Sequence, residues 1–376
     1  MNIVIAPDSF KGSMSATEIC DIGEKVAKRF FPDIDITKVP LADGGEGTVE
    51  SVINATKGEF FDIEVQNPLQ RSTIARYGIM GDGKTAVIEM AEAAGLHKID
   101  LSEQNPMVTS TYGVGQIILH ALDRGCQKFI IGIGGSATND CGIGLIQALG
   151  AKVKDQHGNE VNSGGRGLLE AAEIDLQSFD QRVYQSEFVI ACDVTNPLFG
   201  ERGAAYIFAP QKGATPEMVR DLDRGLRQYS ELVLKTTGIE TAEFPGAGAA
   251  GGLGACFMAF FRGKLQSGID IIIEATKLPA IIQTADIVIT GEGKIDNQTR
   301  FGKAPYGVAK LAYAYEKPVI AICGILEVTP EGLREMHMKA AFSVIQRPCS
   351  LEQAMAQTSE SVELFFYNLF NTLQCK

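Results

Sequence analysis

Glycines and carboxylates follow directly after short runs of β-branched residues at five places in this chain. In the clearest case, the apolar residues 285–290 (ADIVIT) lead into residues 291–299 (GEGKIDNQT). A buried strand that ends in this way presents side chains and backbone groups to a ligand at the carboxyl edge of a sheet. Carboxylates and lysines at such an edge can hold a polyphosphate together with Mg²⁺. The pattern therefore indicates an enzyme and favours phosphoryl transfer.

The other four stretches lie far from the first in the sequence. They are residues 7–12 (PDSFKG), 43–48 (DGGEGT), 132–140 (GIGGSATND) and 193–197 (DVTNP). A shared site requires a fold in which distant strands end side by side, as parallel strands do in α/β proteins. We therefore expect one polyphosphate and metal site assembled from all five stretches.

Three aspartates are the candidates for the chemistry itself, namely Asp43, Asp193 and Asp296, with Glu292 behind them. Mg²⁺ between phosphates takes one or two protein carboxylates and keeps several waters. A hydroxyl acceptor needs a carboxylate within hydrogen-bond reach to take its proton. Each aspartate could instead cap a helix or close an Asx-turn, which contributes about 1 kcal/mol and is common. That alternative explains any one of them more easily than all three.

Lys11 is the candidate cation. It follows a predicted strand end and has Ser9 and Ser13 beside it. In this position its ammonium could hold a phosphate or the carboxylate of an acidic substrate. A solvated surface lysine is the alternative.

Residues 132–137 (GIGGSA) follow a predicted strand and precede a predicted helix. Gly134, Gly135 and Ser136 would then offer N–H groups and a hydroxyl to a phosphate at the helix amino terminus. The segment also matches the glycine pattern of dinucleotide folds, and Asp155 follows at a distance suited to a ribose contact. A nicotinamide-dependent hydroxyacid dehydrogenase is therefore the alternative enzyme. A turn without a ligand is the structural alternative.

Asn139 and Asp140 directly follow this loop and favour a metal-bridged nucleotide over NAD. A carboxylate beside a pyrophosphate repels it unless a cation lies between them. The 4 histidines are isolated from one another and join no motif, which also speaks against hydride chemistry.

Two other glycine-rich segments carry less weight. Residues 78–85 (GIMGDGKT) match the P-loop pattern, but the alternating residues after them predict a hairpin with its turn at Asp82 and Gly83. Residues 246–254 (GAGAAGGLG) could bind a phosphate, pack a helix closely or serve as a hinge between domains.

Charge and composition exclude several classes of protein. The net charge is −12, from 34 Lys+Arg against 46 Asp+Glu, and no basic cluster interrupts it. Nucleic acids and anionic membrane surfaces need a positive footprint, so neither is an expected partner. No apolar run approaches the roughly 18 residues that span a bilayer, and the start of the chain lacks a signal peptide. The 8 cysteines form no C-x-x-C pair, so we expect a cytoplasmic enzyme with reduced cysteines.

Short β-rich runs alternate with helical stretches, which is typical of an α/β protein with parallel strands. A capping box at residues 15–18 predicts the start of the first helix, and residues 60–90 predict three antiparallel strands. Both chain ends have a βαβ pattern around a different middle. This predicts a Rossmann-like α/β domain made of residues 1–70 and 280–376, with an inserted α/β domain of mixed sheet at residues 71–279.

Together, the motif-bearing segments resemble the bacterial glycerate kinases that act on D-glycerate. The resemblance spans nearly the whole chain in order, and as a set its motifs are highly specific. Cys141 stands where the family usually has glycine, and Arg300 where an apolar residue is commoner, but neither change undermines the resemblance. The matching segments are residues 6–16 (APDSFKGSMSA), 41–48 (LADGGEGT), 81–91 (GDGKTAVIEMA), 132–140, 191–198 (ACDVTNPL), 210–214 (PQKGA), 245–255 (PGAGAAGGLGA), 291–299 and 302–309 (GKAPYGVA).

The resemblance implies ATP-dependent phosphorylation of D-glycerate, with 2-phosphoglycerate as the expected product and Mg²⁺ as the metal. It also implies two α/β domains with a cleft between them, one of them the Rossmann-like domain formed by both chain ends. The expected partners are glycerate and ATP. A homodimer, the choice between the 2- and 3-hydroxyl, the pathway and the regulation are left open. A protein that senses glycerate or a nucleotide without turnover is the non-enzymatic alternative.

The resemblance and the residue chemistry divide the candidates into three groups. Asp193 and Asp296 would share the roles of Mg²⁺ ligand and base for the substrate hydroxyl, with Lys11 as the third catalytic residue. The order within the aspartate pair is open. The substrate-binding candidates are Asp8, Ser9, Asp43, Arg71 and Lys303. The nucleotide-binding candidates are Gly134, Gly135, Ser136, Asn139, Gly291 and Glu292.

Overall fold

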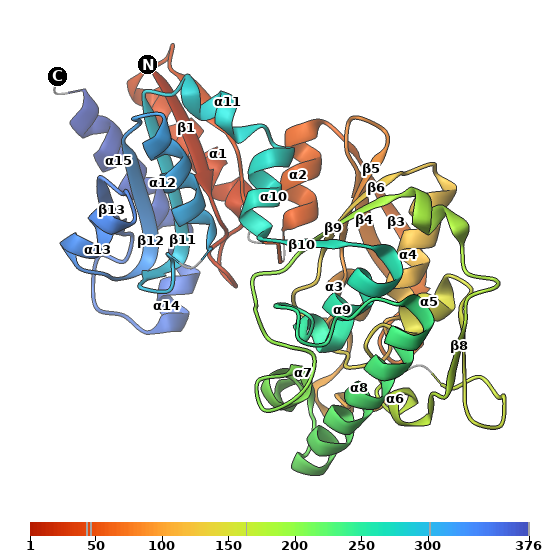
Figure 1. Ribbon diagram of the computed structural model, residues 1–376. Coiled ribbons are helices and arrows are strands. Elements are labelled where there is room, and N and C mark those ends of the chain that lie inside the picture. Colours follow the sequence, from red (N-terminus) through yellow and green to blue (C-terminus); the bar gives the residue numbers. More distant parts are fainter. Residues whose placement is uncertain (43, 46, 163, 301, 375–376) are drawn as a thin grey trace. The chain divides into compact units, whose positions relative to one another are not determined.

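The computed structural model describes residues 1–374, with the exception of residues 43, 46, 163 and 301. Helices alternate with strands along the chain, and most strand pairs are parallel (Figure 1). The predicted α/β fold class with parallel strands is confirmed.

The chain divides into two compact units, each with its own sheet. Unit 1 comprises Met1–Asp43, Glu50–Ala55 and Ile269–Lys376, and unit 2 comprises Gly44–Val49 and Thr56–Gly268. The domain boundaries expected after residues 70 and 279 stay a prediction.

Unit 1 is built on a five-stranded parallel sheet in the order β13-β12-β11-β1-β2. Because β1 has β2 on one side and β11 on the other, the strand order reverses next to β1. In open α/β sheets the crevice at such a reversal, at the carboxyl ends of the strands, is the usual ligand site. The strands are β1 (Asn2–Pro7), β2 (Asp35–Lys38), β11 (Ile287–Asp296), β12 (Val319–Glu327) and β13 (Ala340–Ser343).

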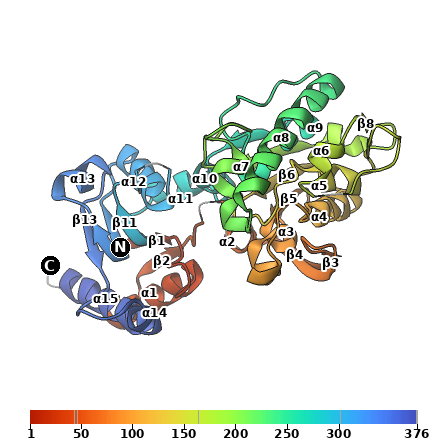
Figure 2. The ribbon, with the colours of Figure 1, turned by 90° about the horizontal axis from the view of Figure 1, so that it is seen from below.

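Helices cover both faces of this sheet, with α1 and α15 on one face and α12 on the other (Figure 2). The core under α1 and α15 includes Ile5, Ile289 and Phe366. The helices are α1 (Ala16–Phe30), α11 (Leu278–Gln283), α12 (Ala304–Ala314), α13 (Pro330–Glu335), α14 (Leu351–Ala356) and α15 (Thr358–Leu373), while α2 (Thr48–Thr56) and α10 (Gly268–Ala275) contain residues of both units.

The predicted capping box of α1 is present. The Ser15 side chain accepts the Glu18 N–H, and the Glu18 carboxylate accepts the Ser15 N–H in return. The last two helices of the chain, α14 and α15, meet at Gln357.

Unit 2 is built on a six-stranded mixed sheet in the order β10-β9-β6-β5-β4-β3. Strands β3, β4 and β5 pair antiparallel, as predicted for residues 60–90. The pairs β5–β6, β6–β9 and β9–β10 are parallel. The turn at Asp82 and Gly83 joins β4 to β5. The predicted hairpin is therefore confirmed, and residues 78–85 do not form a P-loop. The strands are β3 (Glu59–Gln66), β4 (Ser72–Ile79), β5 (Thr85–Glu89), β6 (Lys128–Gly132), β9 (Glu187–Ala191) and β10 (Lys264–Gln266), with β7 (Lys152–Lys154) and β8 (Glu173–Asp175) in a separate pair.

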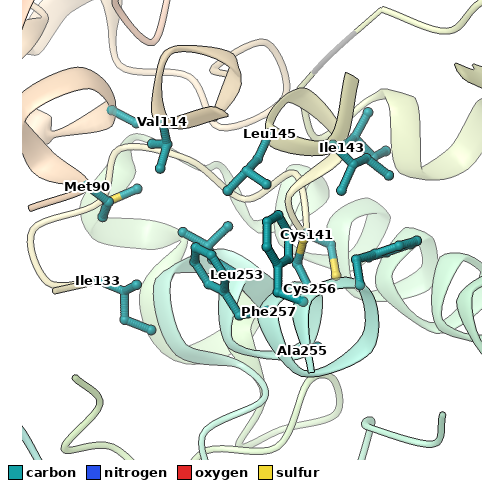
Figure 3. Packing of buried hydrophobic residues seen from close by; sticks show 14 of the residues in the cluster. Met90, Val114, Ile133, Cys141, Ile143, Leu145, Leu253, Ala255, Cys256 and Phe257 are labelled. Carbon is teal, nitrogen blue, oxygen red and sulfur yellow. The ribbon is translucent and has the colours of Figure 1, made fainter. Parts of the chain in front are cut away.

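The core of unit 2 is formed where α4, α5 and α9 meet the loop after β6. Val114, Leu145, Leu253 and Phe257 point toward one another there, beside Cys141 (Figure 3). The helices are α3 (Ala91–Ala94), α4 (Tyr112–Asp123), α5 (Ile143–Ala148), α6 (Gly167–Glu170), α7 (Ala204–Phe208), α8 (Pro216–Thr237) and α9 (Ala249–Phe261), with 3₁₀ turns η1 (Leu96–Lys98), η2 (Leu101–Glu103), η3 (Gln181–Gln185) and η4 (Pro210–Lys212).

Across the described ranges of the chain, no helix combines the length and the apolar character needed to cross a membrane.

Candidate active site

The ends of β1 and β11 lie side by side in unit 1. Pro7 pairs with Gly291 in the parallel register, and the Asp8 N–H donates to the Gly291 carbonyl oxygen at 2.8 Å. Two of the five predicted ligand-binding stretches, residues 7–12 and 291–299, therefore meet at one edge of the sheet.

In the stretch after β1, the carboxylate is buried and the lysine is exposed. Asp8 is only 5% exposed, and its Oδ1 accepts the Ser9 N–H at 2.6 Å. Gly12 has a φ of +78°, a left-handed conformation that turns the chain back after Lys11. The Lys11 side chain lies in solvent at the carboxyl edge, where an anionic ligand can reach it.

Glu292 is the centre of a buried hydrogen-bond network. The Thr299 hydroxyl donates to its Oε1 at 2.7 Å, and Lys303 Nζ lies 2.9 Å from its Oε2. Burial raises the pKa of Glu292, and these two donors offset only part of that rise. Glu292 and Lys303 are therefore bonded to each other. A ligand that binds one of them must compete with the other for its hydrogen bonds.

Asp296 closes an Asx-turn at the end of β11. Its Oδ1 accepts the Gln298 N–H at 2.8 Å, and its Oδ2 lies 3.3 Å from Lys294 Nζ. Burial works to raise the pKa of Asp296, but these donors outweigh it and the net pKa lies below its usual range. The carboxylate is therefore ionised at neutral pH, as both a magnesium ligand and a proton acceptor must be.

In unit 2, β6 and β9 also end side by side. Gly132 pairs with Ala191, so the loop after β6 and the segment with Asp193 leave the sheet at the same edge. Asp193 is exposed, and its Oδ1 accepts the Gly268 N–H at 3.2 Å. This brings together two more of the predicted stretches.

The loop after β6 does not open directly into a helix. Residues 134–136 were expected at a helix amino terminus, but α5 begins only at Ile143. Glycine at position 134 is not required by the fold, because a Cβ there would meet nothing nearer than the Gly45 Cα at 3.5 Å. The bare backbone at Gly134 leaves room for a ligand to approach.

Asp140 explains why the helix starts late. Its carboxylate is fully buried, and its Oδ2 accepts the Thr111 N–H and hydroxyl, both at 2.9 Å, and the Gly144 N–H at 3.2 Å. Burial raises the pKa of Asp140, although these donors work against the rise. The oxygens of Asp140 are bonded within the protein, so this carboxylate orders the loop. The preference for a metal-bridged nucleotide over NAD stays a prediction.

Lys212, in η4, was missed as a site residue. It is 1% exposed, and its Nζ donates to the Ser136 Oγ at 2.8 Å and to the Thr138 carbonyl oxygen at 2.6 Å. Within the described part of the chain it forms no ion pair, and burial lowers its pKa to about 7. Its only signal in the sequence was the motif at residues 210–214, which gives no hint that the lysine is buried.

Asn139 lies next to this lysine-bound carbonyl group and is fully buried. Neither polar atom of its side-chain amide has a hydrogen-bond partner among the residues that the structure describes. Buried amides almost always have partners, so a ligand or a water molecule is expected there.

The remaining candidates are less informative. Arg71 lies between β3 and β4 and forms a two-bond ion pair with Glu103, at 2.7 and 3.1 Å. Asp43 falls outside the described residues.

Among the residues that are described, no group of three or more His, Cys, Asp or Glu side chains could hold a metal ion. Mg²⁺ needs only one or two protein carboxylates, so the role expected for Asp193 and Asp296 stays a prediction.

Three comparisons with known proteins agree with one another. The model of the glycerate kinase family matches residues 3–374. A glycerate kinase of Halalkalibacterium halodurans is 47% identical over 96% of this chain and 95% of its own length. The glycerate 2-kinase of Escherichia coli is 46% identical over 99% of this chain and 98% of its own. A crystal structure from Salmonella typhimurium LT2, assigned as glycerate kinase 2, has a TM-score of 0.90 and 47% identity, covering 100% of this chain and 98% of that one.

Proposed function

The chain belongs to the glycerate kinase family, and we propose that it transfers the terminal phosphoryl group of ATP to the 2-hydroxyl of D-glycerate, with Mg²⁺. The observation that carries the proposal is the pairing of β1 with β11, which gathers an exposed lysine and the ionised carboxylate of Asp296 at one edge of the sheet. Because the chain belongs to a kinase family, we no longer consider the alternative of a nicotinamide-dependent dehydrogenase.

In this proposal the substrate hydroxyl gives its proton to an aspartate carboxylate as its oxygen bonds to the γ-phosphorus. The bond between that phosphorus and the β-phosphate oxygen breaks, and ADP leaves. Asp193 and Asp296 are the candidates for the proton acceptor, and the one that does not accept the proton is the candidate magnesium ligand. Mg²⁺, when bound, would neutralise the charge of the phosphates.

Lys11 is the preferred residue to hold the glycerate carboxylate or the transferred phosphoryl group. It is exposed at the sheet edge. Lys303 shares its ammonium group with Glu292, and Arg71 forms an ion pair with Glu103. We assign the nucleotide phosphates to the turn at Gly134, Gly135 and Ser136.

Lys212 has a positioning role in this proposal. Through its bonds to Ser136 and Thr138 it fixes the turn, and its ammonium adds positive charge behind the N–H groups. A buried cation is costly, and an anionic ligand at the turn would compensate it.

The test is an ADP-release assay with ATP, Mg²⁺ and D-glycerate, with the product identified by phosphorus NMR. Glycerate-dependent ADP release is expected. A doublet from coupling to one proton would identify 2-phosphoglycerate, and a triplet-like signal the 3-isomer. Binding of both ligands without ADP release would contradict the proposal and support a sensing protein.

A further inference from the structure

Ser136 and Lys212 form a buried pair in unit 2 to which the proposed reaction gives no chemical step. Ser136 lies in the loop after β6 and is 6% exposed, and Lys212 lies in η4 and is 1% exposed. The lysine Nζ lies 2.8 Å from the Ser136 Oγ and 2.6 Å from the Thr138 carbonyl oxygen. A serine hydroxyl in hydrogen-bond contact with an amine is one of the arrangements that make serine a nucleophile.

Lys212 can lose its proton near neutral pH. Burial lowers its pKa to about 7, and the carboxylate whose charge acts on it, Asp140, already accepts the N–H and the hydroxyl of Thr111. In the neutral amine, one N–H still donates to the Thr138 carbonyl oxygen, and the lone pair can accept the proton of Ser136. The pair therefore combines a nucleophile, a base and a group that orients the base.

The backbone on both sides of Ser136 is held in place. The Gly135 carbonyl oxygen accepts the Leu96 N–H at 3.0 Å, and the Ala137 N–H donates to the Ala94 carbonyl oxygen at 2.9 Å. The two glycines before Ser136 are exposed, so a ligand at the turn can approach the hydroxyl from solvent. A nucleophile that is already oriented loses little freedom when it reacts.

A phosphoryl group is the electrophile that suits this turn. The Thr138 hydroxyl and the Asn139 amide are buried and have no hydrogen-bond partners among the residues that the structure describes, which indicates a polar group beside them. Transfer of a phosphoryl group would convert the neutral pair into a phosphoserine and an ammonium group, which form a strong charge-assisted bond. A neutral acyl group on Ser136 would gain no such bond.

We propose that Ser136 accepts the terminal phosphoryl group of ATP when glycerate is absent, with Lys212 as the base. The inference rests on the proposed function, which assigns the nucleotide phosphates to this turn. The Ser136 Oγ bonds to the γ-phosphorus and gives its proton to the Lys212 Nζ. The bond between that phosphorus and the oxygen that bridges to the β-phosphate breaks, the oxygen keeps both electrons, and ADP leaves.

Phosphorylation of Ser136 would block the turn. A phosphoserine carries a charge of about −2 and would stay bonded to the Lys212 ammonium, so it would repel the phosphates of a second ATP. Only the neutral form of Lys212 can take the proton, so this reaction should be slow compared with turnover. Bound glycerate offers a competing hydroxyl, and the enzyme should therefore keep its activity while its substrate is present.

The test incubates the full chain with ATP and Mg²⁺ without glycerate and follows the mass of the intact protein. We expect a gain of one phosphoryl group, and fragmentation of the peptides should place it on Ser136. Ser136→Ala should gain no mass. Ser186→Ala is the matched control, because Ser186 is a partly buried serine of unit 2 whose hydroxyl donates to the Arg182 carbonyl oxygen at 2.9 Å. It should gain mass as the wild type does.

Lys212→Met separates the base from the acceptor, because it keeps the Ser136 hydroxyl. At saturating ATP its rate of phosphorylation should fall about a hundredfold, as expected when a general base is lost. D-glycerate, with ATP kept in excess, should slow the mass gain of the wild type about tenfold or more, because the two hydroxyls compete. Phosphorylation of a folded Lys212→Met protein at the wild-type rate would overturn the role of Lys212. If this variant does not fold, the peptide assignment in the wild type decides the matter.

The results also distinguish this inference from the proposed function. A wild-type protein that turns over glycerate but gains no mass, or gains it on another residue, would overturn the inference and leave the kinase proposal standing. Phosphorylation of Ser136 in a protein without glycerate-dependent ADP release would support the inference and overturn glycerate as the acceptor. A protein that shows neither reaction would contradict both.

Discussion

The sheet edge of unit 1 keeps its lysines at or near the surface, whereas the loop at the sheet edge of unit 2 buries both a lysine and an aspartate. In unit 1, Lys11 is exposed and Lys303, 32% exposed, pairs with Glu292. In unit 2, Lys212 and Asp140 are both almost completely buried. Charges near solvent can change partners when a ligand arrives, while buried charges are fixed by packing. The difference predicts adaptable contacts in unit 1 and a preformed site in unit 2.

The rigidity of the unit 2 loop comes from the backbone that packs against it. A Cβ on Gly251 would lie 2.2 Å from the Thr138 carbonyl oxygen, and Cys141 and Ala250 both adopt positive φ values, of 47° and 51°. Non-glycine residues in this conformation are strained and persist only when their surroundings hold them. The strain in Cys141 fits the glycine that the family usually has there.

The largest effects are expected at the two aspartates. Asp193→Asn and Asp296→Asn should each lower kcat by about a thousandfold, because a general base or a metal ligand is lost while the shape is kept. The variant of the metal ligand should also need more Mg²⁺ for half-maximal activity, and the variant of the base should not. Steady-state kinetics over a range of Mg²⁺ concentrations measures both. Near-normal rates in both variants would contradict the mechanism.

Lys212→Met tests whether the buried lysine of unit 2 contributes to the reaction. If Lys212 fixes the loop and supplies charge to it, turnover should fall about a hundredfold, and Lys212→Arg should not restore it because the site has no room. Turnover within about threefold of wild type in a folded Lys212→Met protein would remove Lys212 from the site.

The pH dependence of stability gives an independent readout of Lys212. Its folded pKa of about 7 lies below its ordinary value of 10.5, so the unfolded state binds more protons between these values. Wild-type stability should therefore gain a contribution as the pH rises through this interval, and Lys212→Met should lack it. Urea unfolding at several pH values checks this. Parallel curves for the two proteins would mean that Lys212 keeps its ordinary pKa.

The sequence predicted strand ends better than it predicted what happens beyond them. The pairing of residues 7–12 with 291–299 followed from the β-branched runs and parallel topology, because strand register is a regular pattern. The environments of Asp140 and Lys212 could not follow, because they depend on which distant loops surround them. No local pattern distinguishes a buried lysine from an exposed one.

Thr299→Val tests the network on the unit 1 side, with a smaller effect. The buried Thr299 hydroxyl donates to Glu292 and accepts the Asp296 N–H at 3.1 Å. Its loss should cost about 2 kcal/mol of unfolding free energy. The pKa of Glu292, already raised by burial, should rise further, so the loss should be larger at pH above that pKa than below it. Thr372→Val, on an exposed position of α15, is the control and should be nearly neutral in urea unfolding.

The smallest effect is expected at Arg71, an exposed arginine of unit 2. Its ion pair with Glu103 is open to solvent, with 62% of the arginine side chain exposed, and such pairs contribute roughly 0.5 kcal/mol or less. Arg71→Ala should therefore leave stability nearly unchanged, and the KM for glycerate should rise less than about twofold if Lys11 holds the carboxylate. A tenfold rise in that KM, absent from Glu103→Gln, would return Arg71 to the substrate site and add an adaptable surface contact to unit 2.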